Sequence, residues 1–166
     1  MKHQSDILAL KYRPTDFKDL IGQEYLVETI QKSIELNKIP NAYIFTGIRG
    51  VGKTTTARIV AKMLNCTTFD QNNKPDLSNC DQAKAISEDR HPDVIEIDAA
   101  SNTSVENARE IIENVKYNPV LGKYKVYIID EVHMLSKSAF NALLKTLEEP
   151  PPHSKFIFAT TEISKV

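Results

Sequence analysis

The chain has 166 residues, a formal net charge of −1 and 41% hydrophobic residues. These values are typical of one soluble globular domain and exclude a globally basic nucleic-acid-binding protein, so any contact with DNA must be local or shared among subunits. No apolar run reaches transmembrane length, and the first residues lead into no signal-peptide core, which predicts a cytoplasmic protein without membrane contact. The two cysteines, Cys66 and Cys80, do not amount to a disulfide scaffold.

The first informative elements lie between residues 24 and 65. Residues 24–36 have the apolar spacing of an amphipathic helix, and residues 41–46 form a short apolar run that predicts a buried strand. A glycine-rich run follows, and residues 53–65 again carry apolar side chains at helical spacing. Strand, glycine loop and helix is the order that a phosphate-binding loop requires.

The glycine-rich run fits the phosphate-loop pattern G-x-x-x-x-G-K-[ST]. Its glycines allow the backbone amides to turn inward and form a nest for an anion. Lys53 would bring positive charge to the β- and γ-phosphates, and the Thr54 hydroxyl could ligate Mg²⁺. The pattern predicts a site for a nucleoside triphosphate with Mg²⁺, against the alternative of an ordinary glycine turn. Its members are Gly47, Ile48, Arg49, Gly50, Val51, Gly52, Lys53 and Thr54.

The middle of the chain alternates between polar and apolar segments. Residues 67–79 are polar and rich in turn-forming residues, residues 82–88 could form a short helix, and residues 94–97 read as a strand. Thr103 and Glu106 have the spacing of a capping box, which predicts a helix that begins there. The apolar face of that helix comprises Val105, Ala108, Ile111, Ile112 and Val115.

Residues 125–131 form an apolar strand that ends in two acids, Asp130 and Glu131. A near-continuous apolar run is typical of a strand buried on both faces of a parallel sheet, and ligands of such sheets bind beyond the carboxyl ends of the strands. Asp130 is therefore placed to hold Mg²⁺ opposite Thr54, and Glu131 to orient and polarise the attacking water. The alternative is that two acids only mark a solvated strand end.

The last part of the chain predicts one more helix and one more strand. Ser136 or Ser138 caps the helix, its apolar residues at positions 140, 143, 144 and 147 are expected to be buried, and the prolines at 150–152 end it. Residues 155–161 read as a strand with threonines at its end, which either reach a phosphate or only reflect the β-propensity of threonine. The alternation of strands and helices predicts an α/β domain with a mostly parallel sheet.

Several segments together resemble the N-terminal ATPase domain of the bacterial DNA polymerase III gamma/tau subunits, the clamp-loader ATPases of the AAA+ superfamily. The resemblance covers nearly all of the chain. The segments D-A-A-S-N at 98–102, D-E-V-H-M-L at 130–135 and F-N-A-L-L-K-T-L-E-E-P-P at 140–151 carry it, with the phosphate loop and the K-Y-R-P segment at 11–14. It implies a P-loop NTPase fold of the AAA+ type over residues 1–166, with helices on both sides of the sheet.

The resemblance also implies roles for residues that the patterns alone leave open. Thr55 would join the phosphate-binding residues, and Thr161 would be the first sensor of the γ-phosphate. Tyr12, Arg13 and Ile21 would line the adenine pocket, or serve only as a structural N-terminal clasp. The helix that begins near Thr103 would face primer–template DNA, although the segment has no cluster of basic residues and a solvated helix is an equal alternative.

At the level of function, the resemblance implies an ATPase that binds ATP and Mg²⁺ and helps to load a ring-shaped sliding clamp on primed DNA. Its partners would be the other clamp-loader subunits, the sliding clamp, primer–template DNA and the polymerase holoenzyme. No polymerase active site is recognisable. The alternatives are another AAA+ DNA-processing ATPase, or a nucleotide-binding core that does not turn over by itself.

The sequence departs from this family in two places. The family usually inserts a four-cysteine zinc module after the phosphate-loop helix, but within residues 66–90 only Cys66 and Cys80 remain, and Leu77 and Ala83 stand at the other two positions. Structural zinc almost always needs four ligands, so we expect no zinc and a small apolar plug built on Leu77. The chain also ends before the family's arginine finger, lid and oligomerising collar, which suggests a fragment that is nearly inactive alone.

Overall fold

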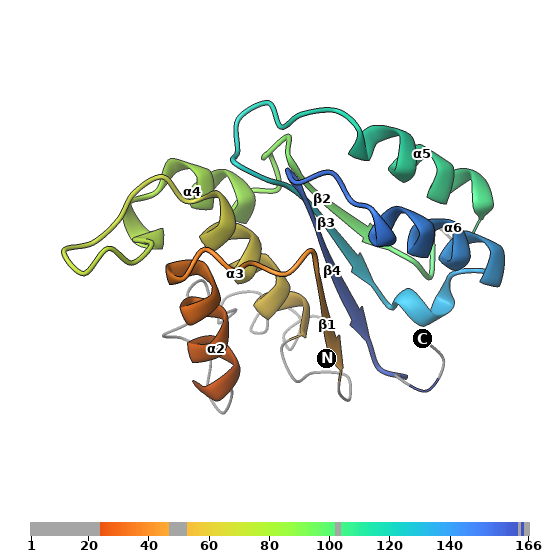
Figure 1. Ribbon diagram of the computed structural model, residues 1–166, viewed down its shortest axis with the longest axis horizontal. Helices are drawn as coiled ribbons and strands as arrows, with labels where there is room; N and C mark the ends of the chain where they lie inside the picture. The colour runs from red at the N-terminus through yellow and green to blue at the C-terminus, as the bar shows by residue number, and fades with distance from the viewer. Residues whose placement is uncertain (1–23, 47–52, 102–103, 163, 165–166) are drawn as a thin grey trace, which may run out of the picture.

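The computed structural model describes residues 24–46, 53–101, 104–162 and 164. These residues contain a parallel sheet of four strands in the spatial order β1-β4-β3-β2, which confirms the predicted α/β class and parallel pairing (Figure 1). Parallel strands must be joined by a crossover connection, and a helix lies in the chain between β2 and β3 and another between β3 and β4. The strands are β1 (Ala42–Thr46), β2 (Val94–Asp98), β3 (Lys125–Asp130) and β4 (Ser154–Thr160).

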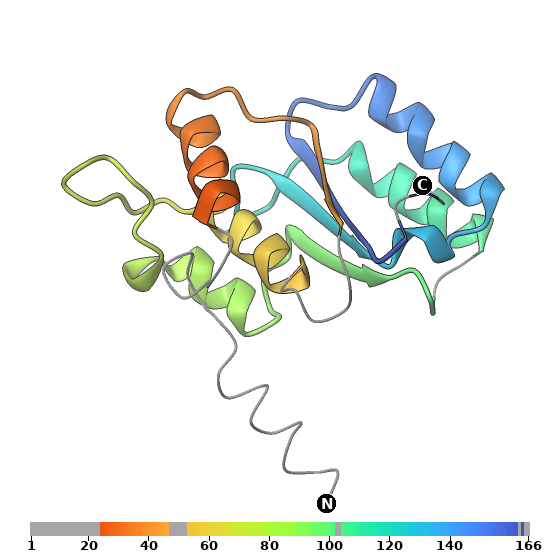
Figure 2. The same ribbon diagram turned by 90° about the horizontal axis from the view of Figure 1, so that it is seen from below.

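Helices cover both faces of the sheet (Figures 1 and 2). One face packs against α2 (Glu24–Glu35), α3 (Lys53–Asn65) and α4 (Asp81–Ser87), and the other against α5 (Val105–Val115) and α6 (Lys137–Glu148). Successive side chains of a strand point to opposite faces, so each strand contributes to both of the resulting apolar cores. In β3, Val126 and Ile128 join the core under α3, whereas Tyr127 and Ile129 join the core under α5 and α6.

The central strands are buried on both faces, as the apolar run at residues 125–131 predicted. Residues 126–129 of β3 are at most 1% exposed, and every residue of β4 is buried. The expectation of a buried strand at residues 41–46 is wrong in part, because β1 lies at the edge of the described sheet and Ile44 is 50% exposed. An apolar run alone does not distinguish a central strand from an edge strand.

Most helix boundaries agree with the periodicity, and α3 begins and ends where it was predicted. The capping box at Thr103 is wrong: α5 has Ser104 as its N-cap, whose hydroxyl accepts the N–H of Asn107 at 3.3 Å, and Thr103 itself lies outside the described residues. Shifting the cap by one residue places Asn107 instead of Glu106 at the third helical position, so no reciprocal bond forms.

Helix α6 shows which of the two serines is its N-cap, and that one of its leucines is exposed. Its N-cap is Ser136, which accepts the N–H of Ala139 at 3.1 Å, and not Ser138. Ala139 and Leu143 are fully buried, but Leu144 is 40% exposed instead of buried. Leu144 follows Leu143 by about 100° around the helix, and this turns it away from the sheet.

The segment between α3 and α4 is held by apolar packing. Cys66, Leu77, Cys80 and Ala83 belong to the same buried cluster as the core under α3. The Cys66 thiol donates to the carbonyl oxygen of Thr68 at 3.1 Å, and burial raises its pKa to about 12. Within the described part of the chain, no group of three or more His, Cys, Asp or Glu side chains is placed to hold a metal ion.

A dense set of hydrogen bonds closes the end of the sheet where the strands begin. Asp93, only 1% exposed, precedes β2 and accepts the N–H groups of Val120, Leu121 and Gly122 at 2.7, 2.7 and 2.6 Å. Asn65, at the end of α3, is fully buried; its side chain donates to the carbonyl of Tyr124 at 3.0 Å and accepts that residue's N–H at 2.8 Å. These bonds fix the loop that leads into β3.

No helix among the described residues is long and apolar enough to cross a membrane.

Candidate nucleotide-binding site

The candidate site lies at the opposite end of the sheet, where the strands finish. Helix α3 begins there with Lys53, which is 8% exposed, and the positive end of its dipole faces the same region. Asp130 is the last residue of β3, and Thr160 is the last residue of β4, its direct neighbour. The fold therefore brings the start of the predicted phosphate-loop helix close to the two acids.

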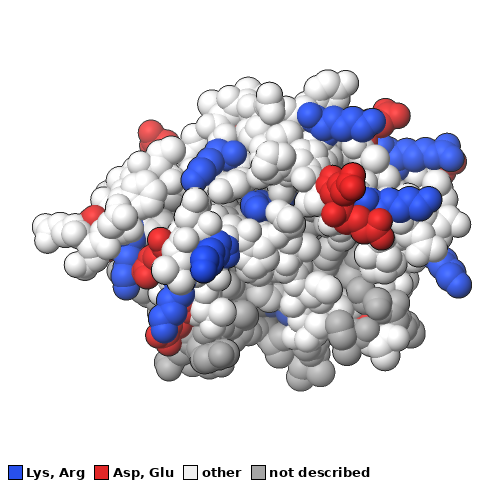
Figure 3. Space-filling model, in the orientation of Figure 1, with Lys and Arg blue, Asp and Glu red and all other residues white. Residues whose placement is uncertain are grey.

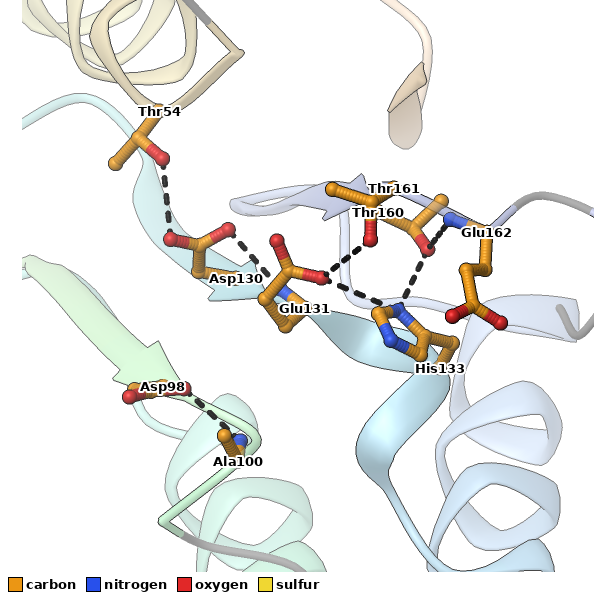
Figure 4. Close-up of polar contacts among 9 residues, drawn as sticks. All are labelled: Thr54, Asp98, Ala100, Asp130, Glu131, His133, Thr160, Thr161 and Glu162. Atoms are coloured by element: carbon orange, nitrogen blue, oxygen red, sulfur yellow. Dashed lines mark hydrogen bonds and ion pairs between the residues drawn. The ribbon is translucent and has the colours of Figure 1, made fainter. Parts of the chain in front are cut away.

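Thr54 and Asp130 are in contact although 76 positions separate them. The Thr54 hydroxyl donates to Asp130 Oδ2 at 3.1 Å, and the other carboxylate oxygen accepts the N–H of Glu131 at 3.0 Å (Figure 4). Hydroxyl and carboxylate oxygens are the ligands that Mg²⁺ prefers, so the two side chains fit a Mg²⁺ ion that would bind between them. This is the placement that the sequence predicted for the pair.

The loop after β2 is tied to the same strand end. Asp98 lies opposite Asp130 in the sheet register, and the Asp98 carboxylate accepts the N–H of Ala100 at 2.9 Å. The N–H of Ala99 donates to the carbonyl oxygen of Asp130 at 2.9 Å. This bond ties the loop after β2 to the backbone of Asp130, whose carboxylate bonds to the start of α3.

Glu131 lies just beyond β3 and not within it, as the predicted range 125–131 had assumed. Its backbone is left-handed, with φ 51° and ψ 48°, a conformation that is uncommon for a residue with a long side chain. The turn ends the strand and starts the short 3₁₀ helix Val132–Met134. Strained backbone of this kind is concentrated at functional sites, where the surrounding structure enforces it.

The Glu131 carboxylate points towards the end of β4. Its Oε2 accepts the Thr161 hydroxyl at 3.1 Å and lies 3.3 Å from Nδ1 of His133 (Figure 4). The same His133 nitrogen is 2.8 Å from the Thr160 hydroxyl oxygen, which also accepts the N–H of Glu162 at 3.0 Å. The predicted water-orienting acid and the predicted sensor threonine are thus in direct contact.

His133 and Thr160 are the site residues that the sequence reasoning missed. In the sequence, the D-E-V-H segment carries only the family resemblance, and Thr160 is one of two strand-end threonines. A histidine three positions after the first acid was the available signal, but its contacts depend on the left-handed turn at Glu131. That turn has no pattern in the sequence.

Several predicted site residues lie outside the described part of the chain, and their roles stay predictions. They are Tyr12, Arg13, Ile21 and the phosphate-loop residues Gly47, Ile48, Arg49, Gly50, Val51 and Gly52. Thr55, in contrast, lies in the first turn of α3 beside Thr54.

The face drawn in Figure 3 carries charged side chains of both signs. On the face drawn in Figure 3, basic and acidic side chains lie side by side over the region of α5 and α6. No continuous basic stripe crosses the described part of that face. Affinity for a phosphate backbone normally comes from clustered Lys and Arg, so this face offers only isolated contacts.

The described residues form an α/β domain with a four-stranded parallel sheet between two layers of helices. Solved structures of low sequence identity share this fold. The RuvB Holliday junction branch migration motor of Thermotoga maritima matches 93% of this chain with 44% of its own, at a TM-score of 0.61 and 19% identity. A DNA polymerase III gamma subunit-related protein of the same organism matches 84% of this chain and 40% of its own, at a TM-score of 0.54 and 23% identity.

The family is shown by sequence. The model of the family described as DNA polymerase III, delta subunit matches residues 22–166, so the chain belongs to this family of DNA polymerase III subunits. Within it, the chain corresponds to the N-terminal region of the gamma/tau subunits: it is 51% identical to DNA polymerase III subunit tau of Escherichia coli over 160 residues, 96% of this chain. The chain spans about a quarter of the length of that relative, 25%.

Proposed function

We propose that this chain is the Mg²⁺-ATP-binding core of a clamp-loader motor subunit, which uses ATP hydrolysis to help place a sliding clamp on primed DNA. The observation that carries the proposal is the convergence of Thr54, Asp130, Glu131 and Thr161 at one end of the sheet. The similarity to tau subunits supports the same reading. Residues 1–166 would form one AAA+ nucleotide-binding domain of a cytoplasmic protein, with residues 66–90 as an insertion that binds no zinc.

The residues of α3 and β3 would hold the nucleotide phosphates. Lys53 supplies positive charge at the start of α3, and the helix dipole adds to it. Thr54 and Asp130 would hold Mg²⁺, which when bound neutralises charge on the β- and γ-phosphates. The loop residues 47–52 would add backbone amides, as the phosphate-loop pattern predicts.

Glu131 and Thr161 would carry the hydrolytic step. Glu131 accepts a proton from a water molecule as the water oxygen attacks the γ-phosphorus and the bond to the bridging oxygen of ADP breaks. The Thr161 hydroxyl, which donates to Glu131 at 3.1 Å, would donate to the γ-phosphate when nucleotide is bound. When the Thr161 hydroxyl exchanges Glu131 for the γ-phosphate as its acceptor, the Glu131 carboxylate would be released. Binding of the γ-phosphate would thus be coupled to the release of Glu131.

Two substitutions test the nucleotide site in the complete subunit. Lys53→Ala should abolish binding of a fluorescent ATP analogue, whereas Lys84→Ala, which removes an exposed lysine from α4, should not. Glu131→Gln should bind nucleotide but lose hydrolysis by about 10²- to 10⁴-fold, the range for a general base. Glu148→Gln on α6 is its control. Normal hydrolysis by Glu131→Gln would show that the role given to Glu131 is wrong.

A further inference from the structure

His133 has an environment that the proposed hydrolysis leaves unexplained. Its side chain is 8% exposed and lies against the carboxylate of Glu131 and the hydroxyl of Thr160 (Figure 4). A histidine in the first turn after a strand could simply be a core residue. This one presents the same ring nitrogen, Nδ1, to both polar neighbours.

The positions of Glu131 and Thr160 indicate which ring nitrogen of His133 carries the hydrogen. Glu131 Oε2 lies 3.3 Å from Nδ1, and a nitrogen lone pair facing an ionised carboxylate at that distance would be repelled. The Thr160 oxygen already accepts the N–H of Glu162, and it can accept a second donor through its remaining lone pair. Both contacts are therefore favourable when Nδ1 carries the hydrogen: the N–H donates to Thr160 at 2.8 Å, and its positive end lies 3.3 Å from Glu131 Oε2.

His133 and Thr161 hold the same carboxylate oxygen. Thr161 donates to Oε2 of Glu131 at 3.1 Å, and His133 approaches that oxygen from the neighbouring turn. Among the described residues, no hydrogen bond reaches the other oxygen, Oε1, and the Glu131 side chain is 29% exposed. The arrangement fixes the plane of the carboxylate and leaves one oxygen for a water molecule.

We propose that His133 is a positioning residue for Glu131: its Nδ1–H holds Glu131 Oε2 so that Oε1 faces the attacking water. The proposal rests on the role given to Glu131 under the proposed function. It matters most in the nucleotide-bound state, because there the Thr161 hydroxyl would turn to the γ-phosphate and His133 would be the remaining donor to Oε2. Without it, the carboxylate could rotate away from the water.

Two substitutions that are matched in polarity separate this role from a structural one. In His133→Asn, the amide nitrogen takes the place of Nδ1 and keeps the donor to Glu131. In His133→Gln, the amide nitrogen reaches the place of Nε2 and the donor to Glu131 is lost. Both variants keep a polar amide of similar burial, so a difference between them reports the position of the hydrogen-bond donor.

The experiment measures kcat for ATP hydrolysis, nucleotide affinity and thermal unfolding of the complete subunit, assembled with its partner subunits and primed DNA. We expect His133→Gln to lower kcat by about 10- to 100-fold, the effect of a misplaced catalytic group. Its nucleotide affinity should stay within about 3-fold of the wild type, since the polar contacts of the His133 side chain within the described part of the chain are with Glu131 and Thr160. His133→Asn should keep kcat within about 3-fold.

A double variant completes the design. In the Glu131→Gln background, His133→Gln should cause no further loss of kcat, because a residue that acts through Glu131 has nothing left to position. Equal losses for His133→Asn and His133→Gln, or an additive loss in the double variant, would overturn the proposal. If Glu131→Gln itself hydrolyses normally, the proposed function of Glu131 fails first; if Glu131→Gln is inactive and His133→Gln is fully active, only the inference fails.

Discussion

The two ends of the sheet are built differently. At the end where the strands begin, buried side chains are bonded to backbone groups: Asp93 accepts three amide N–H groups, and Asn65 bonds both the N–H and the carbonyl of Tyr124. At the end where the strands finish, side chains bond mainly to other side chains, as Thr54 does to Asp130 and Thr161 to Glu131. Asp93 and Asn65 are buried, whereas Thr54, Asp130, Glu131 and Thr161 are half-buried.

This contrast indicates which end of the sheet can exchange its hydrogen-bond partners. A buried carboxylate that is saturated by amide groups has no better alternative, and breaking its bonds leaves uncompensated polar groups in the interior. A hydroxyl bonded to a half-exposed carboxylate loses little when a phosphate or a cation replaces that partner. We therefore assign stability to the beginning of the strands and ligand exchange to their ends.

The largest expected effect concerns Asp93, at the end of the sheet where the strands begin. Asp93→Asn replaces a carboxylate that accepts three N–H groups with an amide that has a single acceptor oxygen and whose NH₂ group opposes another donor. We expect a loss of about 3 kcal/mol in the free energy of unfolding, measured by urea denaturation. Asp98→Asn, at the opposite end and exposed, should cost less than about 1 kcal/mol.

Equal costs for Asp93→Asn and Asp98→Asn would contradict the comparison. Such a result would mean that the loop of residues 120–122 can find other acceptors, and that the bonds at the beginning of the strands are as exchangeable as those at their ends.

The stability that Asp93 contributes should depend on pH. Burial alone would raise the pKa of Asp93, but the N–H groups of Gly122, Val120 and Leu121, together with the nearby His91, hold it below its ordinary value. A lowered folded-state pKa gives stability that is complete above the unfolded-state pKa, about 3.9, and is lost as the pH falls through the folded-state value. The gap in unfolding free energy between wild type and Asp93→Asn should thus narrow below about pH 4.

A urea series at each pH measures this gap directly. Other carboxylates with lowered pKa values, among them Glu88, destabilise both proteins alike on acidification, and so their effect cancels in the difference. A gap that stays unchanged down to about pH 3 would show that the folded state does not lower the pKa of Asp93.

A smaller effect concerns the fit between Gly122 and Asn65. A Cβ atom at Gly122 would lie 2.7 Å from Oδ1 and 2.8 Å from Cγ of the fully buried Asn65. Asn65 cannot move without losing its two bonds to Tyr124, so Gly122→Ala should cost about 2 kcal/mol in the free energy of unfolding. The cost should nearly disappear in an Asn65→Ala background, which removes the clashing atoms. An unchanged cost there would place the conflict elsewhere.

How much of the molecule follows from the sequence depends on the range of the interactions. Local periodicity correctly predicted the parallel sheet and the exact bounds of α3, and the two acids at the end of a buried strand predicted the meeting of Asp130 with Thr54. Parallel topology supplies the reason, because it brings strand ends that are distant in sequence to one edge.

The rest depends on contacts that no local pattern encodes. Asp93 reaches residues 27 to 29 positions away, and nothing in the segment His91-Pro92-Asp93 indicates a triple acceptor. The contact between His133 and Glu131 arises from one left-handed residue, and Glu has no special preference for that conformation. The exposure of Leu144 reflects which side of α6 faces the sheet, a tertiary property.

The smallest expected effect concerns the exchangeable end and the backbone of Glu131. At φ 51° an alanine retains the steric cost of the left-handed conformation, whereas a glycine does not, so Glu131→Gly should be more stable than Glu131→Ala by about 0.5–1 kcal/mol. Neither variant keeps the carboxylate, so the lost hydrogen bond to Thr161 and the lost contact with His133 cancel in the comparison. At Lys116, which ends α5 with a right-handed φ of −67°, the sign should reverse, and the alanine variant should be more stable than the glycine variant.

Urea denaturation of the four variants measures these differences. Equal stability of Glu131→Gly and Glu131→Ala would mean that the turn relaxes once the carboxylate is gone. A stable preference for glycine would show that the fold enforces this conformation, and that the site end retains a strained residue in exchange for a correctly placed acid.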